Sequence, residues 1–148
     1  MDNYLELEIL LAERIKIQTG IYSLGIVDLY ESKPGQLPSP SVYISLHNDD
    51  PSTNIGKQQH TTQDWFVVPI IRVSSDKTSK GIASSSAGNT IMKIIRAIHD
   101  WTPQSIQIEK PPKYKKFARI KSPQKPFADY GFIHYPLLFR TEFVFNIE

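Results

Sequence analysis

The end of the chain constrains the fold most, because residues 133–148 alternate like one long β-strand. Hydrophobic side chains occupy one face, interrupted only by Thr141: Tyr135, Leu137, Phe139, Phe143, Phe145 and Ile147. A period of two with one apolar face is typical of a strand that lays one side on a core. We therefore expect the terminal segment to be a packed strand of a sheet, not a tail.

Two segments have the periodicity of amphipathic helices. The first carries an apolar stripe of leucine and isoleucine, begins at a capping box formed by Asn3 and Glu6, and ends near Thr19 at Gly20. The second runs from about Ser85 to Asp100, and a Trp-Thr-Pro sequence ends it. These patterns predict two main helices.

Further extended segments are predicted at 24–29, 41–47, 64–73 and 117–120. The 64–73 segment is apolar on both faces, so we expect a helix to cover one side and another element the other. Pro69 cannot donate a ladder hydrogen bond, which favours an edge or bulged position. The polar stretch 48–62, with a proline and a glycine, is interpreted as a long exposed loop. The fold class is predicted to be α+β: a mostly antiparallel sheet with two main helices packed on it, in a single domain spanning 1–148.

Composition narrows the function classes. The 148 residues include no cysteine, which excludes disulfides and thiolate chemistry. No apolar run approaches the roughly 20 residues that span a bilayer, and the acidic N-terminal residues do not resemble a signal peptide, so we expect no membrane association and no secretion. The net charge of +2 hides an asymmetry, because the 110–125 segment holds seven basic residues and no acidic one. Such a segment suits nucleic acid or an acidic protein surface.

Motifs of enzyme chemistry are weak. Residues 83–90 resemble a phosphate-binding loop but have Ala83 and Asn89 where that motif needs glycine and lysine. No nucleophile elbow accompanies His99 and Asp100, so we interpret this histidine as a helix-end residue. A metal site is conceivable only in the 48–62 region and its flank, where a solvated loop is the simpler interpretation; the residues concerned are His47, Asp49, Asp50 and His60. We expect no enzyme, no metal and no cofactor.

The basic segment leaves two interpretations open. Tyr114 and Phe117 are interleaved with its lysines, a composition that suits stacking on bases and contact with phosphates. A basic surface segment is more often a solvated surface or a contact with a protein or a neighbouring subunit. A nucleic-acid-binding module is therefore kept as an alternative to an interaction protein.

The order of the elements resembles a known family. An amphipathic helix precedes a Pro38-x-Pro40 entry into a strand, and a second strand, at 65–73, leads into a helix at 91–98. That helix ends in the sequence His-Asp-Trp-Thr-Pro, and a loop leads to the terminal strand. This layout, over nearly the whole chain, is similar to the tail terminator proteins of long-tailed bacteriophages, of the lambda and Mu types. Tail-completion proteins of the head side are similar as well.

The resemblance implies a function in assembly. It implies a non-enzymatic virion component, a homohexameric ring that caps the tail tube, terminates its polymerisation and offers a surface to the head. The partners would be other copies of the chain, the tail-tube protein and the head–tail connector protein, with nucleic acid only passing through the ring. The location would be the virion tail, after assembly in the bacterial cytoplasm. We expect the subunit or tube contacts at Lys57, His60, Lys110, Lys113, Tyr114, Lys115, Lys116, Arg119, Lys121 and Lys125.

Overall fold

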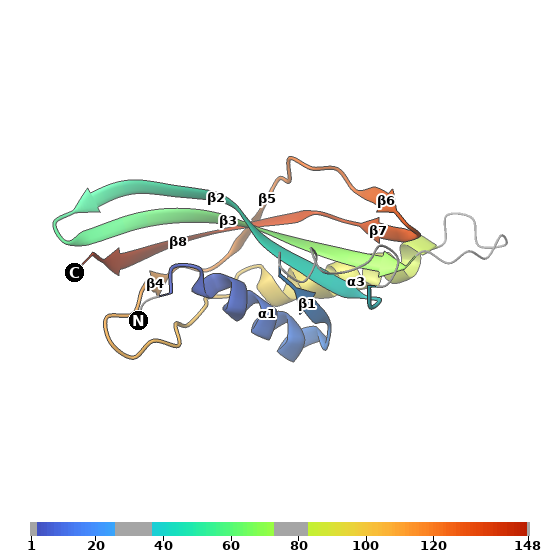
Figure 1. The fold of residues 1–148 in the computed structure, drawn as a ribbon, viewed down its shortest axis with the longest axis horizontal. Coiled ribbons are helices and arrows are strands. Elements are labelled where there is room, and N and C mark those ends of the chain that lie inside the picture. Colours follow the sequence, from blue (N-terminus) through green and yellow to red (C-terminus); the bar gives the residue numbers. More distant parts are fainter. Residues whose placement is uncertain (1–2, 26–36, 73–82, 148) are drawn as a thin grey trace.

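The computed structural model describes residues 3–25, 37–72 and 83–147, with the side chains of 83–86 left aside. One long, mostly antiparallel sheet carries the two described helices on one face (Figure 1). The α+β architecture is as predicted. The elements are α1 (Glu6–Thr19), β1 (Tyr22–Leu24), β2 (Ser41–Ile55), β3 (Gln58–Arg72), α3 (Ala83–Ile98), β4 (Lys113–Tyr114), β5 (Ala118–Ile120), β6 (Phe127–Asp129), β7 (Phe132–His134) and β8 (Leu137–Asn146).

The centre of the sheet is β3, which has different partners along its length. It pairs with β2 on one side; on the other it pairs first with β8 and then, from Ile70 to Arg72, with β7. The short strands β4 and β5 lie along the far side of β8, and β1 runs parallel to the first residues of β2. Across its middle the sheet therefore runs from β2 at one edge to β4 and β5 at the other.

The predicted loop at 48–62 is a β-hairpin, so that interpretation was wrong. The two strands join through a two-residue turn at Gly56 and Lys57, where Gly56 has a φ of 60° that suits glycine. From Asn48 to Gln58 the side chains are exposed, so no apolar alternation marks the strands. Their order comes from pairing with each other and with β8, whose residues reach Gln58. We call residues 48–62 the arm.

Two further expectations about the strands need correction. Pro69 lies in the central strand, not at an edge. Its carbonyl accepts a 3.0 Å hydrogen bond from the N–H of Tyr135, at the point where β3 changes from β8 to β7. The missing N–H of Pro69 is tolerated at this break in the ladder. The terminal segment is correspondingly two strands, β7 and β8, separated by Tyr135 and Pro136.

The core lies between the sheet and the helices. Its largest cluster combines residues of α1, α3, β2, β3 and β8 with Ile21 and Phe117. The members are Leu7, Leu10, Leu11, Ile15, Ile21, Val42, Ile44, Trp65, Val67, Ile94, Ala97, Ile98, Phe117, Leu137, Phe139 and Phe143. On the opposite face, Phe66, Val68 and Leu138 form a small cluster. Among the described residues, Tyr43 and Ile120 pack against this cluster, and the ring of His47 lies 4.6 Å from that of Phe66. The helices thus cover one face of the 64–73 strand, as predicted, and the described residues cover the other face with fewer side chains.

The start of α1 differs from the predicted capping box. The Asn3 side chain accepts a 3.0 Å hydrogen bond from the N–H of Leu5, and the Asn3 carbonyl accepts one of 3.1 Å from the N–H of Glu6. The Glu6 carboxylate accepts hydrogen bonds from Ser105 and Tyr114. Glu6 is fully buried and holds other partners. The predicted stop is correct, because Gly20 ends the helix with a φ of 75°. The predicted extended segment 24–29 begins in β1, and its residues from 26 onward lie outside the described chain.

Candidate assembly interfaces

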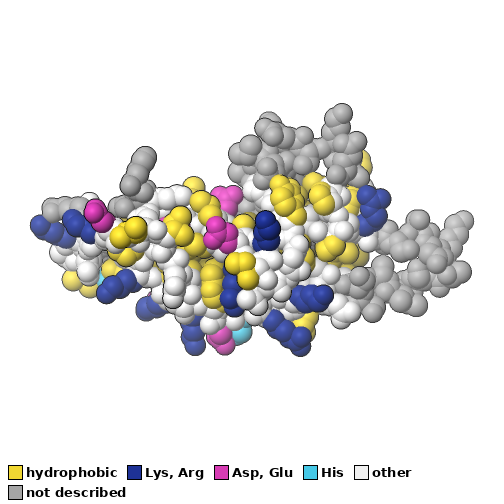
Figure 2. All heavy atoms as spheres, turned by 90° about the horizontal axis from the view of Figure 1, so that it is seen from below, with side chains coloured by type: hydrophobic (Ala, Val, Ile, Leu, Met, Phe, Trp, Pro, Cys, Tyr) yellow, Lys and Arg dark blue, Asp and Glu magenta, His cyan; other side chains and the backbone are white. Residues whose placement is uncertain are grey.

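The basic side chains gather along the edge formed by β4 and β5. Between Lys113 and Lys121 this edge has five basic residues and no acidic one. They are Lys113, Lys115, Lys116, Arg119 and Lys121, and all five are exposed. Figure 2, which views the helix-bearing face, shows Lys and Arg side chains along its lower rim and hydrophobic side chains scattered across its middle. We call residues 113–121 the basic edge.

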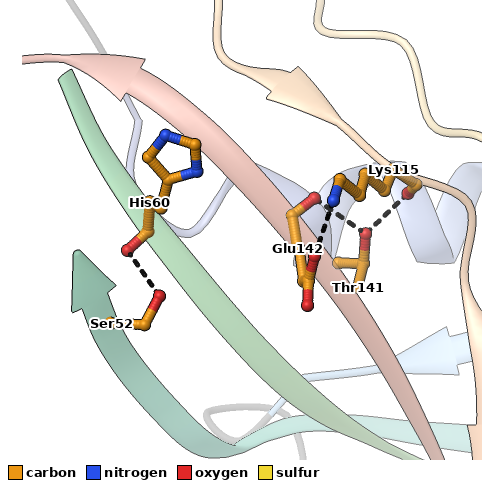
Figure 3. Close-up of polar contacts among 5 residues, drawn as sticks. All are labelled: Ser52, His60, Lys115, Thr141 and Glu142. Carbon is orange, nitrogen blue, oxygen red and sulfur yellow. Dashed lines mark hydrogen bonds and ion pairs between the residues drawn. The ribbon is translucent and has the colours of Figure 1, made fainter. Parts of the chain in front are cut away.

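Two of these cations have acidic partners within the chain. Lys115 Nζ lies 2.9 Å from Glu142 Oε2, and Lys116 Nζ lies 3.7 Å from Asp100. Both pairs are more than half exposed, so each contributes only about 0–1 kcal/mol to stability. The backbone carbonyl of Lys115 accepts a 2.6 Å hydrogen bond from Thr141 Oγ1, which fixes this edge against β8 (Figure 3).

The aromatic residues of this edge face inward. The Tyr114 hydroxyl donates a 3.0 Å hydrogen bond to Glu6, and burial and this bond raise the pKa of Tyr114. Phe117 is fully buried and its ring stacks on Trp101 at a centroid distance of 5.8 Å. Neither ring stands free to stack on a base. The aromatic residues therefore anchor the edge, and its five cations are exposed.

The predicted contact residues fall into several places. His60 on β3 and Lys113 on β4 are both in register with Val144, so the two share one face of the sheet. With Lys115 and Glu142 they line a hollow of about 110 Å³. Arg119 and Lys121 line another hollow beside Pro136.

The other predicted residues lie elsewhere. Lys57 is in the turn of the arm, where its carbonyl accepts a 2.8 Å hydrogen bond from the N–H of Ile147. Lys125 is exposed in the connection between β5 and β6. Lys110 lies with Tyr114 at a groove on the helix side of the sheet.

That groove was not anticipated from the sequence. It has a volume of about 230 Å³, and its apolar lining is made by Tyr4, Tyr114, Phe143, Phe145 and Ile147. The alternation of the terminal strand predicted a core face for three of these side chains. Phe143 is buried in the core cluster and Phe145 packs against it, while Ile147 is 55% exposed. All three also line the groove. The ring of Tyr4 lies edge-on to Phe143 and Phe145, at 5.8 and 5.7 Å.

Helix α1 has a second apolar stripe that faces solvent. Leu5 and Ile9 are 45% and 43% exposed, and Ile17 is 77% exposed. Ile106 and Ile108, in the loop that follows α3, are 63% and 95% exposed. A helix that is apolar on both sides normally buries both, so the outer side of α1 has the composition of a contact surface.

The comparisons with known proteins give these surfaces a context. The family model described as phage tail terminator protein matches residues 25–148. The chain belongs to the phage tail terminator protein family. Among curated proteins, none matches this chain. A solved chain from the virion of a native gene transfer agent (GTA) particle is similar, with 14% identity over 95% of this chain and 88% of that one, and a TM-score of 0.46.

As a tail terminator family member, the protein is a structural component of the virion that takes part in tail assembly. Contact with other virion proteins is the corresponding mode of action. In a protein that acts through such contacts, exposed sheet edges, grooves and charged side chains are the features that can form the interfaces. The tail terminator offers all three on the described surface: the basic edge, the apolar groove and the arm.

One polar hollow of this tail terminator lies on the sheet face opposite the helices. Asp64 is buried there, and the Arg140 guanidinium holds it with two hydrogen bonds of 2.7 and 3.0 Å. Burial raises the pKa of Asp64, but the hydrogen bonds from Arg140 and Asn48 outweigh it and leave the pKa below its ordinary value. Asp50 and Glu142 complete the rim. Among the described residues no group of three or more His, Asp or Glu side chains is placed to hold a metal ion.

The remaining motifs have structural positions. The segment that resembles a phosphate-binding loop forms the first turns of α3. His99, just after α3, accepts a 3.2 Å hydrogen bond at Nδ1 from the N–H of Arg119, so it holds β5 in place. Neither described helix is long and apolar enough to cross a membrane.

Proposed function

We propose that the protein forms a ring that caps the tail tube, stops its polymerisation and presents a surface to which the head is joined. The observation that carries this proposal is the match of the tail terminator family model to 124 consecutive residues, from 25 to 148. The ring is a homohexamer, its further partners are the tail-tube protein and the head–tail connector protein, and it assembles in the bacterial cytoplasm.

The exposed features support a protein that works through contacts. The outer stripe of α1 and the apolar groove leave hydrophobic side chains that a neighbouring subunit or the tube would cover. The ten predicted contact residues are proposed to contact the neighbouring subunit or the tube as well. Lys113, Lys115, Lys116, Arg119 and Lys121 lie on the basic edge, and Lys57, His60, Lys110, Tyr114 and Lys125 lie in the arm, at the groove and in the β5–β6 connection.

The experiment that tests this function measures tube length. Tail-tube protein of the same phage is polymerised with and without the purified protein, and the tubes are measured by negative-stain electron microscopy. We expect tubes with the protein to stop growing and to carry a ring at one end. Tubes that grow to the same length with and without it would contradict the proposal.

The mass in solution gives a second measurement. Six copies of the 16.9 kDa chain give about 101 kDa, which light scattering at rising protein concentration resolves from a monomer. Salt-dependent binding to nucleic acid, with a log–log slope set by the phosphates neutralised, would instead support the nucleic-acid-binding alternative.

A further inference from the structure

The outer edge of β2 is open over most of its length. β2 pairs with β3 along one side, but on its other side β1 reaches only Ser41 to Tyr43. From Ile44 to Ile55 no strand of the described chain lies beside β2 on this second side. Such an edge exposes unpaired backbone N–H and C=O groups, which readily pair with another chain. We call residues 44–55 the open edge.

The open edge is acidic and partly protected. The whole of β2 contains Asp49 and Asp50 and no lysine or arginine. Asp50 is exposed, and it acts electrostatically on Arg140 across the sheet. Pro51 and two register shifts, at His47 and Ser52, interrupt the strand. These interruptions hinder pairing of the edge with unrelated strands, while the negative charge of the two aspartates favours a basic partner.

The opposite edge of the same sheet has the matching charge. Of the five cations of the basic edge, only Lys115 and Lys116 form ion pairs in the described chain. Lys113, Arg119 and Lys121 have no acidic side chain within 4 Å among the described residues, so most of the positive charge is available to another molecule.

The two edges cannot meet within one molecule, because β3 and β8 lie between them. They can meet between copies. We propose that the open edge of one copy receives the basic edge of the next, in a head-to-tail contact that repeats around the assembly. A heterologous contact of this kind closes into a ring when its rotation permits. The proposal rests on the proposed ring and names the surfaces that close it.

Cysteine cross-linking tests the contact directly, because the chain has no cysteine of its own. Double variants Asp50→Cys with Lys113→Cys, and Asp50→Cys with Lys121→Cys, are treated with a bis-maleimide about 10 Å long. Head-to-tail contact predicts a ladder of covalent oligomers that ends at the ring size, while each single variant yields none. The matched control combines Asp50→Cys with Lys93→Cys, an exposed residue of α3, and yields no ladder.

A charge swap gives an independent readout. The first variant, Asp50→Lys with Thr53→Lys, makes the open edge basic. The second, Lys113→Glu with Arg119→Glu and Lys121→Glu, reverses the three cations of the opposite edge that have no acidic partner among the described residues, so that edge becomes acidic. Each variant alone places like charges at every contact and is expected to weaken self-association at least about tenfold. An equal mixture restores it, because the two variants alternate around the ring. An unchanged oligomer mass for both single variants, or no recovery in the mixture, would overturn the proposal.

Both assays are run on free protein and on protein bound to tube ends, so that a ring formed only on the tube is also tested. Absence of the ladder in both settings overturns the edge contact. Tubes that are capped without edge cross-links leave the proposed function intact and reject the edge contact. Cross-linked rings that do not stop tube growth would support the edge contact and reject the proposed function.

Discussion

The hydroxyl of Tyr114 donates a 3.0 Å hydrogen bond to the Glu6 carboxylate, although 108 residues separate them in the sequence. Ser105 Oγ donates to the other oxygen of the same carboxylate at 3.1 Å. Glu6 is fully buried. One buried carboxylate therefore ties the start of α1 to the loop after α3 and to the basic edge.

Removal of this carboxylate is expected to destabilise the fold. Glu6→Ala leaves two hydroxyl groups without their acceptor, which we expect to lower the free energy of unfolding by about 1–3 kcal/mol. Urea unfolding followed by circular dichroism measures it. The control is Glu13→Ala, an exposed residue of the same helix, with an expected change within about 0.5 kcal/mol. Equal losses for the two variants would show that burial of Glu6 has no energetic role.

Arg140→Ala is expected to lower the free energy of unfolding, because it removes the partner of Asp64. Asp64 would keep its buried charge without its main partner, so we expect a loss of about 1.5–3 kcal/mol. Lys115→Ala removes a pair that is exposed on both sides, and about 0.5 kcal/mol or less is expected. Chemical unfolding at neutral pH compares the two variants, and a smaller loss for Arg140→Ala than for Lys115→Ala would contradict this ranking.

The Asp64–Arg140 pair also predicts that the stability of the fold depends on pH in the acid range. The folded pKa of Asp64 is lower than its ordinary value of 3.8. The unfolded chain therefore binds the proton more readily, so the contribution is present above pH 3.8 and is lost as the pH falls through the folded pKa. Stability measured from pH 5 downward should fall less steeply for Arg140→Ala than for the unaltered protein. Parallel curves would refute the coupling.

His134 predicts a second dependence of stability on pH, in a higher pH range. Burial lowers the pKa of His134 below its ordinary value of 6.5, and Asp129 only partly opposes this. The folded state thus favours the neutral ring, which stacks on Phe127 at 4.6 Å. Its contribution is fully present above pH 6.5 and is lost as the pH falls through 6.5 to the folded pKa. Thermal unfolding between pH 8 and 5 should show this decrease, and His134→Gln should reduce its slope.

Charge reversal on the basic edge should separate folding from assembly. Lys113, Lys115 and Lys116 are exposed, so their joint replacement by Glu is expected to leave the unfolding free energy within about 1 kcal/mol. Assembly on the tube and tail length are expected to change. Lys93→Glu on α3 is the control for charge alone. Normal tails from the triple variant would exclude this edge as a contact surface.

The sequence predicted the elements that have one apolar side. Both helices and the strand around Phe139 were predicted because burial on one face leaves a periodic pattern. The strand around Trp65 was predicted because it is apolar on both faces. The arm was missed because its side chains from Asn48 to Gln58 are exposed, so no apolar alternation marks its strands and backbone pairing orders them. The break at Tyr135 and Pro136 was missed because it depends on β3 changing partners, which only the tertiary structure determines.

The candidate interfaces were predicted in part. The cations of the basic edge were found because they are a run of like charge, and all five are exposed. Tyr114 was expected to face a partner, yet its hydroxyl is bonded to Glu6. The groove beside Tyr4 could not be foreseen, because it depends on where α1 stops covering the terminal strand.

The arm gives the molecule an evolutionary freedom that its core lacks. Apart from Asp49, whose carboxylate accepts hydrogen bonds from Tyr4 and Gln63, the exposed residues between Asn48 and Gln58 can be substituted without loss of a core contact as long as the turn at Gly56 and the backbone ladder survive. Natural variation can therefore alter what this part of the surface recognises without redesigning the rest of the fold. We expect divergent relatives to differ most in the side chains of this hairpin and least around Trp65.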